Sequence, residues 1–329
     1  MARSVDVAIV GGGISGMTAA LTAARRGWKT IVLTGGVLGG QLISIDKVEG
    51  VPGFPDGIAG YDLGPMAQEQ ADAAGAELMM ASCQAIEAAG KDWVLKSDEG
   101  DVSARAVVLA TGASFAKLGL QGEQQFAGKG VSDCASCDGP LLRDKVAVVV
   151  GGGDSALQEA LTLADHAAKI FILERAASLT GQAIYQERIR ANKKIEVRTL
   201  STISEICGGD AVSHVRVKDL ATGGESNLAA SAVFPFIGLV PNSELGRGLL
   251  SLDASGRVIV DSAMRTSALG ICAGGNVRQY SSHRAAGAMG DGTVAAMSID
   301  RYLKNGEWRD ADIQPPSDRQ IDSSGRVTE

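Results

Sequence analysis

Near its amino end the chain reads Val7-Ala8-Ile9-Val10-Gly11-Gly12-Gly13-Ile14-Ser15-Gly16 and continues into a segment rich in alanine and leucine. A β-branched apolar run that ends in glycines and precedes such a segment predicts a strand, a tight turn and a helix. Gly11 permits the turn, Gly13 lets the backbone approach a pyrophosphate, and Gly16 lets the helix pack closely on the strand. The phosphates would meet free N–H groups beside Ile14 and Ser15. The stretch predicts a dinucleotide-binding unit.

The same pattern occurs a second time. Residues 145–173 align with residues 5–33 without a gap, and a glycine triplet again separates an apolar run from a helical segment. The positions equivalent to the first phosphate loop are Gly151, Gly153, Asp154, Ser155 and Ala156. Two copies in the required strand and helix context are far more specific than one. We therefore expect two dinucleotide-binding domains.

The two copies differ where a ribose hydroxyl is read, at the end of the second strand. The first copy has Thr34 and the second has Glu174. A carboxylate accepts hydrogen bonds from a free ribose diol and repels a 2′-phosphate, so Glu174 favours NADH over NADPH. Arg175 works in the opposite direction, because a guanidinium can hold that phosphate. A solvated charge pair at a strand end is the structural alternative.

The composition restricts the class of protein. With 329 residues, 45% of them hydrophobic, the chain is long enough for two domains with sizeable cores. Its net charge of −7 argues against a nucleic-acid partner, because phosphate backbones select basic surfaces. No apolar run is long enough to span a bilayer, and residues 1–4 lead directly into a strand. We expect a soluble, cytoplasmic protein.

Two of the five cysteines are close together, in Cys134-Ala135-Ser136-Cys137-Asp138. A dithiol two residues apart forms a small disulfide ring and reopens it by thiol–disulfide exchange. Cys83, Cys207 and Cys272 are isolated and are most simply small buried apolar residues. Zinc would need two further ligands that no neighbouring histidine or cysteine supplies, so no metal site is expected. Two dinucleotides and one dithiol suggest an electron relay.

Asp138 directly follows the second cysteine. A carboxyl group there can carry the proton that each thiol loses or gains. The alternative is a capping or turn aspartate ahead of Gly139-Pro140.

The order of the remaining segments predicts how the domains are connected. Residues 107–112 are expected to be the last strand of the first domain, and residues 232–238 its analogue in the second. Beyond the turn at Pro241-Asn242, residues 257–260, residues 270–277 and a helix from about Arg284 contain no third phosphate loop. The simplest placement returns them to the first domain. Residues 309–329 are polar, contain Pro315-Pro316, and predict a loose tail.

The expected fold is α/β, with two Rossmann-like domains of the three-layer ββα type, the second inserted in the first. The expected boundaries are 1–117 with 246–310 for the first domain, 118–245 for the second, and 311–329 for a flexible tail.

These motifs together resemble the low-molecular-weight, bacterial-type thioredoxin reductases, over residues 5 to about 305. The matching blocks are Gly39-Gly40-Gln41-Leu42, Val48-Glu49, Pro52-Gly53, Ala110-Thr111-Gly112-Ala113, Cys134-Ala135-Ser136-Cys137-Asp138-Gly139 and the turn from Gly274 to Val277.

The resemblance implies the cofactors and the residues that bind them. It implies FAD on the first repeat and the returning segment, at Gly11, Gly13, Ile14, Ser15, Gly16, Thr34, Gly40, Gln41, Leu42, Thr111, Gly112, Gly275, Asn276, Val277, His283, Arg284 and Ala285. It implies NADH or NADPH on the second repeat, at Gly151, Gly153, Asp154, Ser155, Ala156, Glu174, Arg175 and Gly238.

The resemblance also implies roles for the dithiol. Cys137 would be the sulfur that faces the flavin, Cys134 the one that attacks a partner, and Asp138 the acid. Because the nicotinamide and the disulfide cannot occupy one flavin face together, the family implies a rotation of the second domain, with hinges near 117–121 and 240–245. A homodimer is implied as well.

The chain departs from the common family pattern at four places. Glu174-Arg175-Ala176 replaces a His-Arg-Arg cluster of NADPH users, and Pro140-Leu141 replaces two aromatic anchors of a docking surface for thioredoxin. Gly275-Asn276 replaces Gly-Asp, and His283-Arg284-Ala285 replaces Arg-Gln-Ala beside the flavin ring. A positive charge there would raise the flavin potential.

The predicted function is transfer of electrons from NADH or NADPH through FAD to the dithiol, and on to a thioredoxin-like protein or a small disulfide. A dithiol oxidase of the same fold, with oxygen as acceptor, is a second hypothesis. A flavin-bound redox sensor without turnover is a third.

Overall fold

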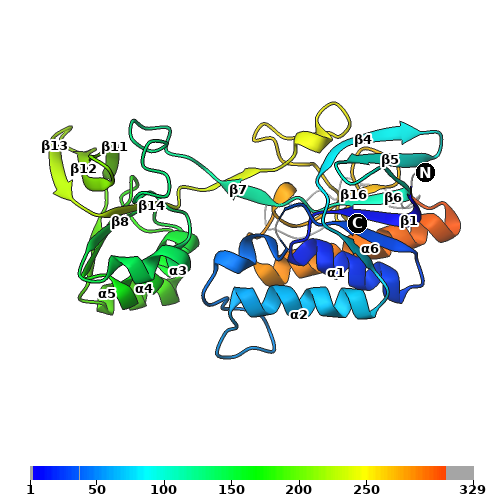
Figure 1. The fold of residues 1–329 in the computed structure, drawn as a ribbon, viewed down its shortest axis with the longest axis horizontal. Helices are drawn as coiled ribbons and strands as arrows, with labels where there is room; N and C mark the ends of the chain where they lie inside the picture. Colours follow the sequence, from blue (N-terminus) through cyan, green and yellow to red (C-terminus); the bar gives the residue numbers. More distant parts are fainter. Residues whose placement is uncertain (1–2, 37, 309–329) are drawn as a thin grey trace, which may run out of the picture.

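The computed structural model describes residues 3–36 and 38–308, which form two lobes connected by a narrow two-stranded ribbon (Figure 1). The ribbon pairs β7 (Ala113–Phe115) with β15 (Leu239–Pro241) in antiparallel register. The chain leaves the first lobe along β7 and returns along β15, so the second lobe is an insertion in the first. This topology confirms the predicted fold class. The predicted tail at 311–329 lies outside the described residues.

The first lobe is built on a parallel sheet. Its path is β3 (Glu77–Met79), β2 (Thr30–Leu33), β1 (Arg3–Val10), β6 (Val102–Leu109), and β16 (Ile271–Ala273) pairs with β6. The antiparallel strands β5 (Asp92–Ser97) and β4 (Cys83–Ala89) continue from β6. Strand β1 is buried on both faces from residue 7 to 10, as its unbroken apolar run requires.

Three helices cover one face of this sheet (Figure 1): α1 (Ile14–Arg25), α2 (Gly60–Ala73) and α6 (Ala285–Asn305). Helices α1 and α6 pack tightly because the contact uses glycine: a β-carbon on Gly292 would lie 2.2 Å from the Ser15 carbonyl oxygen. The returning segment therefore completes the first lobe, as the sequence predicted.

The second lobe repeats the unit. A parallel sheet runs in the order β10 (Ile195–Arg198), β9 (Lys169–Leu173), β8 (Val146–Val150), β14 (Ala232–Pro235), next to α4 (Asp154–His166) and α5 (Ala183–Ala191). An antiparallel sheet of β11 (Ser201–Gly208), β12 (Val212–Asp219) and β13 (Glu225–Ala229) lies beyond it. The units β1-α1-β2 and β8-α4-β9 occupy the two predicted repeats, which confirms the duplication.

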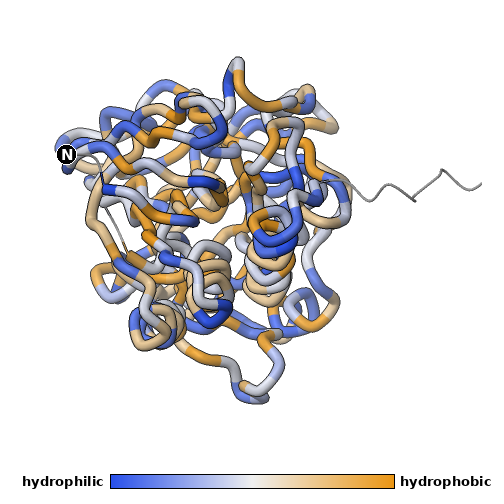
Figure 2. Tube along the Cα trace, turned by 90° about the vertical axis from the view of Figure 1, so that its right-hand side faces the viewer, coloured by the Kyte–Doolittle hydropathy of each residue, from blue (hydrophilic) through white to orange (hydrophobic). Residues whose placement is uncertain are grey.

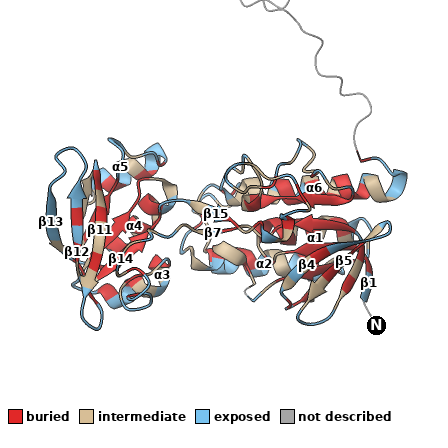
Figure 3. Cartoon of the chain, turned by 90° about the horizontal axis from the view of Figure 1, so that it is seen from above, coloured by how far each residue is buried: buried red, intermediate tan, exposed pale blue. Residues whose placement is uncertain are grey.

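Short helices complete both lobes. They are η1 (Gly40–Ser44), η3 (Glu244–Gly246) and η4 (Gly275–Val277) in the first lobe, and α3 (Ala135–Asp138) with η2 (Gly139–Leu142) in the second. The buried residues gather on the strands and on the inner faces of the helices (Figure 3). Hydrophobic and hydrophilic stretches are interspersed along the trace of both strands and helices (Figure 2).

The three isolated cysteines differ in burial. Cys272, in strand β16, is fully buried, as predicted. Cys83 and Cys207 are only half-buried, so the expectation of three buried residues was too broad. The reason is their position: β4 and β11 each present one face to solvent. Burial raises the pKa of the Cys83 thiol to about 11.

No helix within the described ranges combines the length and apolar character that crossing a bilayer requires.

Candidate functional site

The first glycine loop has the geometry of a phosphate cradle. Gly11 has a φ of +118°, and a β-carbon there would lie 2.2 Å from the Ala110 carbonyl oxygen. A β-carbon on Gly16 would lie 2.0 Å from the Gly11 carbonyl oxygen, so α1 approaches the turn as closely as glycine allows. Gly13, by contrast, faces open space, with no atom within 4 Å of an added β-carbon. The backbone is therefore exposed where a pyrophosphate would approach.

Ser15 supplies a second sign of a missing ligand at this loop. Its side chain is buried, and its Oγ has no hydrogen-bond partner among the described residues. The hydroxyl lies against Gly274, where a β-carbon would come within 2.9 Å of Oγ. A buried hydroxyl is normally satisfied. The open backbone at Gly13 and the unsatisfied Ser15, at the N-terminus of α1 beside Ile14, fit the pyrophosphate of FAD.

The remaining predicted flavin residues surround this loop. Gly40 packs on Gly13, and buried Thr34 lies beside Gly12 and donates its hydroxyl to the Met79 carbonyl oxygen at 3.2 Å. Gln41 donates Nε2 to the Ala113 carbonyl oxygen at 2.9 Å. Asn276 donates Nδ2 to Gln41 Oε1 at 2.8 Å and accepts from Ser281 Oγ at 3.0 Å. Residues from four separate segments thus meet at one place.

Strand β6 of the first lobe ends beside the ribbon. Thr111 donates its hydroxyl to the Asn242 carbonyl oxygen at 2.5 Å, and Asn242 donates Nδ2 to the Thr111 carbonyl oxygen at 3.0 Å. Gly112, with a φ of +70°, lies in the turn between β6 and β7. Predicted flavin residues are therefore joined directly to the second strand of the connection.

The turn at Gly275 to Val277 is held by a buried carboxylate. Asp291, on α6, accepts the Gly275 N–H at 2.9 Å and pairs with Arg278 through both carboxylate oxygens at 2.7 Å. Sequence reasoning missed Asp291 and Arg278. The available signal was a single acid within the otherwise small and apolar first half of α6.

The second glycine loop repeats the geometry of the first. Gly151 has a φ of +126°, and a β-carbon there would lie 2.2 Å from the Phe236 carbonyl oxygen, while Gly153 again faces open space. Asp154 begins α4 and accepts the Gln182 N–H at 2.6 Å. Ser155 is exposed and Ala156 is buried against the sheet. The open backbone at a helix N-terminus fits the pyrophosphate of a second dinucleotide.

Glu174 lies at the ribose position of this loop. Its carboxylate reaches Gly152, where a β-carbon would come within 2.6 Å of Oε2, and Oε1 accepts the Ala176 N–H at 2.7 Å. Arg175 is exposed at the same strand end, and Gly238, with a φ of +126°, is exposed where β14 leads into the ribbon. The fixed anion beside Gly152 is placed to accept a ribose diol.

The two motif cysteines form a disulfide at the start of the short helix α3. Cys134 is its N-cap, and Sγ accepts the Cys137 N–H at 3.2 Å. Cys134 is buried, whereas Cys137 is exposed. Asp138 is the last residue of α3, and its side chain makes no capping hydrogen bond to η2. The capping alternative for Asp138 therefore finds no support in the structure.

The disulfide lies where the lobes touch. Ser136 donates its hydroxyl to the Ser44 carbonyl oxygen at 2.9 Å, and Cys134 Sγ is 3.9 Å from the same oxygen. Ser44 closes η1, the helix that carries Gln41, so the disulfide is brought beside the predicted flavin residues. The segment 44–49 makes two further contacts: Gln158 donates to the Lys47 carbonyl oxygen, and Arg188 pairs with both Glu49 oxygens at 2.9 Å.

Arg284 points to the second lobe. Its guanidinium pairs with Asp154, at the start of α4, and Ala285 begins α6 directly after it. The resemblance put the stretch that contains Arg284 beside the flavin ring, and in the structure the guanidinium partner is Asp154, a residue of the second phosphate loop. Both residues were predicted to bind cofactors, and here they bind each other.

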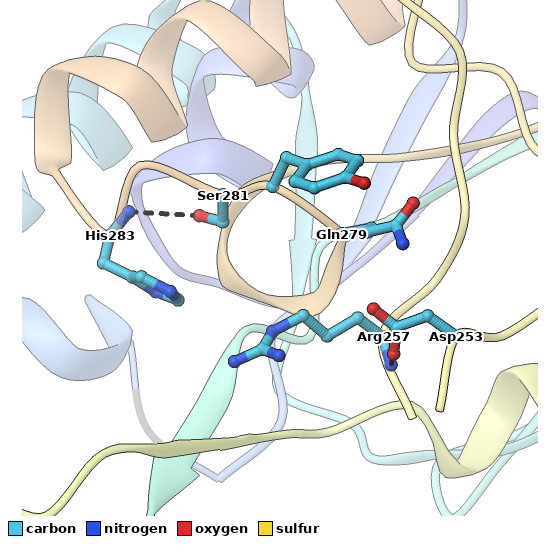
Figure 4. Close-up of a pocket in the computed structure, with 6 residues that line it drawn as sticks. Asp253, Arg257, Gln279, Ser281 and His283 are labelled. Atoms are coloured by element: carbon cyan, nitrogen blue, oxygen red, sulfur yellow. Dashed lines mark hydrogen bonds between the residues drawn. The ribbon is translucent and has the colours of Figure 1, made fainter. Parts of the chain in front are cut away.

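His283 lines a pocket of about 290 Å³ together with Asp253, Arg257, Gln279 and Ser281 (Figure 4). Ser281 Oγ accepts the His283 N–H at 3.3 Å. Burial lowers the pKa of His283, and the nearby charges of Arg257 and Arg278 lower it further. The imidazole is therefore neutral at pH 7, and Arg284 carries the only positive charge within the His283-Arg284-Ala285 stretch.

Among residues 3–36 and 38–308, no group of three or more histidine, cysteine or acidic side chains is arranged to hold a metal ion.

Comparison with known proteins places this geometry in a family. The pyridine nucleotide-disulphide oxidoreductase family matches residues 5–292. A thioredoxin reductase of Treponema pallidum is 38% identical over 306 residues, which cover 92% of this chain and 98% of the relative. A thioredoxin reductase of Mycolicibacterium smegmatis is 40% identical over 299 residues, 91% of this chain and 96% of the relative.

Solved structures of thioredoxin reductases have the same overall fold as this chain. The Lactococcus lactis thioredoxin reductase, described as the FR conformation, superimposes with a TM-score of 0.89 at 35% identity, covering 91% of this chain and 99% of that one. The T. acidophilum thioredoxin reductase superimposes with a TM-score of 0.87 at 31% identity, covering 90% of this chain and 98% of that one. The chain therefore belongs to the pyridine nucleotide-disulphide oxidoreductase family, among its low-molecular-weight thioredoxin reductases, and is a disulfide oxidoreductase that uses FAD and NAD(P)H.

Proposed function

We propose that this enzyme passes two electrons from NADH, through FAD in the first lobe, to the Cys134–Cys137 disulfide and then to the disulfide of a thioredoxin-like protein or a small molecule. The net reaction is NADH plus a proton plus a disulfide, giving NAD⁺ and a dithiol. The observation that carries the proposal is the position of the redox disulfide, whose neighbour Ser136 bonds to Ser44 beside the flavin residues. When bound, FAD supplies an acceptor for hydride and a donor to the disulfide.

The proposal assigns FAD to residues 1–117 with 246–310, and the nicotinamide dinucleotide to residues 118–245. The unsatisfied Ser15 and the open backbone at Gly13 support the first assignment. The open backbone at Gly153 beside Glu174 supports the second. The crossing at β7 and β15 falls next to both proposed boundaries.

Rotation of the second lobe is part of the proposal. The lobes are joined by one two-stranded ribbon and by polar contacts at segment 44–49 and Arg284, so their relative position can change without breaking either core. The proposed hinges at 117–121 and 240–245 directly follow and overlap the ribbon. A cross-link that locks these hinges should stop turnover, and unchanged turnover would argue against rotation.

The physiological partner is proposed from the surface beside the disulfide. Leu141 is 67% exposed and follows Pro140, so an apolar side chain is offered to a partner close to the sulfurs. The two aromatic anchors of common family members are replaced here by Pro140 and Leu141. We therefore propose that the partner is a small disulfide, or a thioredoxin-like protein whose docking surface differs from that of the common thioredoxins. A homodimer in the cytoplasm is proposed from the family alone.

Anaerobic addition of NADH to the yellow, flavin-loaded protein tests the function. Rapid bleaching followed by reduction of an added protein disulfide is the expected result. Bleaching only by dithiols would instead support a dithiol oxidase, and no bleaching by either would support a redox sensor.

The nicotinamide preference has its own test. Glu174→Ala removes the acceptor for the ribose diol and the repulsion of a 2′-phosphate, so the preference for NADH over NADPH should fall, by about tenfold for each 1.4 kcal/mol lost. Arg175→Ala is the contrasting variant: it removes a guanidinium at the same strand end that can hold a 2′-phosphate, so the preference for NADH should rise. A preference unchanged in Glu174→Ala would remove the ribose role of this residue.

A further inference from the structure

Glu159 is a buried acid directly beneath the redox helix. It lies on α4, is 7% exposed, and its Oε2 has no hydrogen-bond partner in the part of the chain that the structure describes. Its helical neighbours Leu157, Ala160 and Leu163 belong to one apolar cluster with Ala135 of α3. An unpaired carboxylate in such surroundings costs folding free energy. The predicted relay does not use this residue, and sequence reasoning did not single it out.

The environment of Glu159 makes its charge adjustable near neutral pH. Burial raises the pKa of its carboxyl group to about 7, the hydrogen bond from the Ala135 backbone opposes the rise, and the negative charge of Asp46 adds to it. A carboxyl group of this kind holds a proton in roughly half of the molecules at pH 7. A small change in local charge then shifts its protonation.

The disulfide is the source of such a change. Ala135, which bonds to Glu159, is the residue next to Cys134 and the first residue of α3. Two-electron reduction breaks the neutral S–S bond and, with uptake of one proton, leaves one thiol and one thiolate. The new negative charge disfavours a second negative charge close by. Reduction of the pair therefore favours the protonated form of Glu159.

We propose that Glu159 is a positioning residue that stores a proton for the redox pair, binding one when the Cys134–Cys137 disulfide is reduced and releasing it when the disulfide forms. The full change is disulfide plus carboxylate plus two electrons plus two protons, giving thiol, thiolate and carboxylic acid. No net charge is then added to the buried region between α3 and α4. The proposal rests on the role of the cysteine pair as a redox couple.

Other charges near this part of α4 must be separated from Glu159 in any test. Strand β8 and helix η2 carry no ionisable side chain, and β9 carries one at its start. The ionisable groups on the elements packed against α4, or at its end, are Asp46 of the first lobe, Asp138 of α3, Tyr185, Glu187, Arg188 and Arg190 of α5, Lys169 of β9, and His166. Burial raises the pKa of Tyr185 to about 12, outside the range of the experiment.

The test is the pH dependence of the disulfide equilibrium in the flavin-loaded protein. Wild type and Glu159→Gln are equilibrated anaerobically with mixtures of reduced and oxidised dithiothreitol from pH 6 to 9, and the reduced fraction of the pair is measured by alkylation and mass spectrometry. The reagent's own pH dependence cancels in the ratio of the two equilibrium constants for reduction. This readout requires neither NADH nor a partner protein, so it separates failure of the proposal from failure of the proposed function.

The expected sign follows from the two protonation states. Below pH 7 Glu159 is protonated whether the pair is oxidised or reduced, so the ratio of wild type to variant is constant. Above pH 7 reduction of the wild type takes up an additional proton, so the ratio falls by up to tenfold per pH unit, or about 30 mV, until the higher pKa of the reduced form is passed. A ratio that stays constant from pH 6 to 9 would overturn the proposal.

Two controls exclude a merely structural effect. Asp165→Asn removes an exposed carboxylate from the same helix and should leave the pH dependence unchanged. Asp138→Asn identifies the alternative group: if it abolishes the additional slope and Glu159→Gln does not, the assignment to Glu159 is wrong. Reduced-minus-oxidised infrared spectra of wild type labelled with ¹³C-glutamate should gain a protonated carboxyl band, and absence of that band would also overturn the proposal.

Discussion

Gly13 and Gly16 lie three residues apart in one loop. Substitution of each by alanine should nevertheless weaken FAD binding for a different physical reason. At Gly16 a β-carbon would lie 2.0 Å from the backbone oxygen of Gly11, so α1 must move away from the turn by about 1 Å or more. At Gly13 a β-carbon meets no atom within 4 Å, and the φ of −77° suits alanine. Gly16→Ala should therefore strain the fold itself, and Gly13→Ala should obstruct only the phosphates.

The magnitudes follow from this difference. Overpacking against a backbone atom costs about 1–3 kcal/mol, which should lower the thermal midpoint of flavin-free Gly16→Ala by several degrees. Flavin-free Gly13→Ala should be as stable as wild type, or more stable by up to about 1 kcal/mol, because alanine restricts the unfolded chain. Both variants should bind FAD about 5- to 150-fold more weakly, the equivalent of 1–3 kcal/mol.

The assay is titration of flavin-free protein with FAD, followed by fluorescence quenching, with thermal unfolding measured on the same samples. Gly153→Ala is the matched control. A β-carbon at Gly153 also meets no atom within 4 Å, but this glycine belongs to the phosphate loop of the second lobe. It should keep full FAD affinity and lose affinity for the nicotinamide dinucleotide. The reasoning is refuted if Gly13→Ala destabilises the flavin-free protein or binds FAD as tightly as wild type.

Three further predictions use other residues of the site and core. Cys137→Ser should still allow NADH to reduce FAD but should trap Cys134 in a mixed disulfide with the partner, visible on a non-reducing gel; full turnover by this variant would contradict the assignment. Asn276→Ala removes the donor to Gln41 Oε1 and should weaken FAD binding about tenfold, and an unchanged affinity would show that the amide is not needed. Hydrogen bonds from three side chains lower the pKa of buried Asp300, so Asp300→Asn should cost about 1–3 kcal/mol at pH 7. The difference from wild type should begin to shrink as the pH falls below about 4, the pKa of an unfolded aspartate, and should be lost only as the pH falls through the much lower folded-state pKa. Denaturant unfolding at pH 7 and pH 3 should therefore show a smaller, but not vanished, difference at pH 3.

Much of the fold could be predicted because it rests on local patterns that occur twice. Apolar runs such as Val146–Val150 form parallel strands wherever they are covered on both faces, and the glycine at each turn is required by backbone geometry. The insertion was predictable too, because the segment after Pro241 has no phosphate loop and must complete another sheet. Strand β16 does so by pairing with β6.

The site was predicted less completely, because contacts between lobes depend on their placement rather than on sequence distance. Nothing in the sequence around Ser44 indicates that its carbonyl oxygen accepts a hydrogen bond from Ser136, 92 residues away. Arg284 was expected at the flavin because the family has a polar residue there, and its pairing with Asp154 depends on the same placement. Glu159 was missed because a charged residue on an amphipathic helix is usually solvated.

The contacts between the lobes also indicate how firmly the disulfide is held in its present position. The two ion pairs, Arg284 with Asp154 and Arg188 with Glu49, involve guanidinium groups that are nearly half exposed, and such pairs contribute about 0–1 kcal/mol each. Each lobe, by contrast, has its own buried core. An anionic pyrophosphate on the second phosphate loop would repel the carboxylate of Asp154 and would compete with it for the guanidinium of Arg284. If the proposed rotation takes place, occupancy of that loop would weaken one of the contacts that keep the disulfide beside Ser44, and nucleotide binding would favour the change of position.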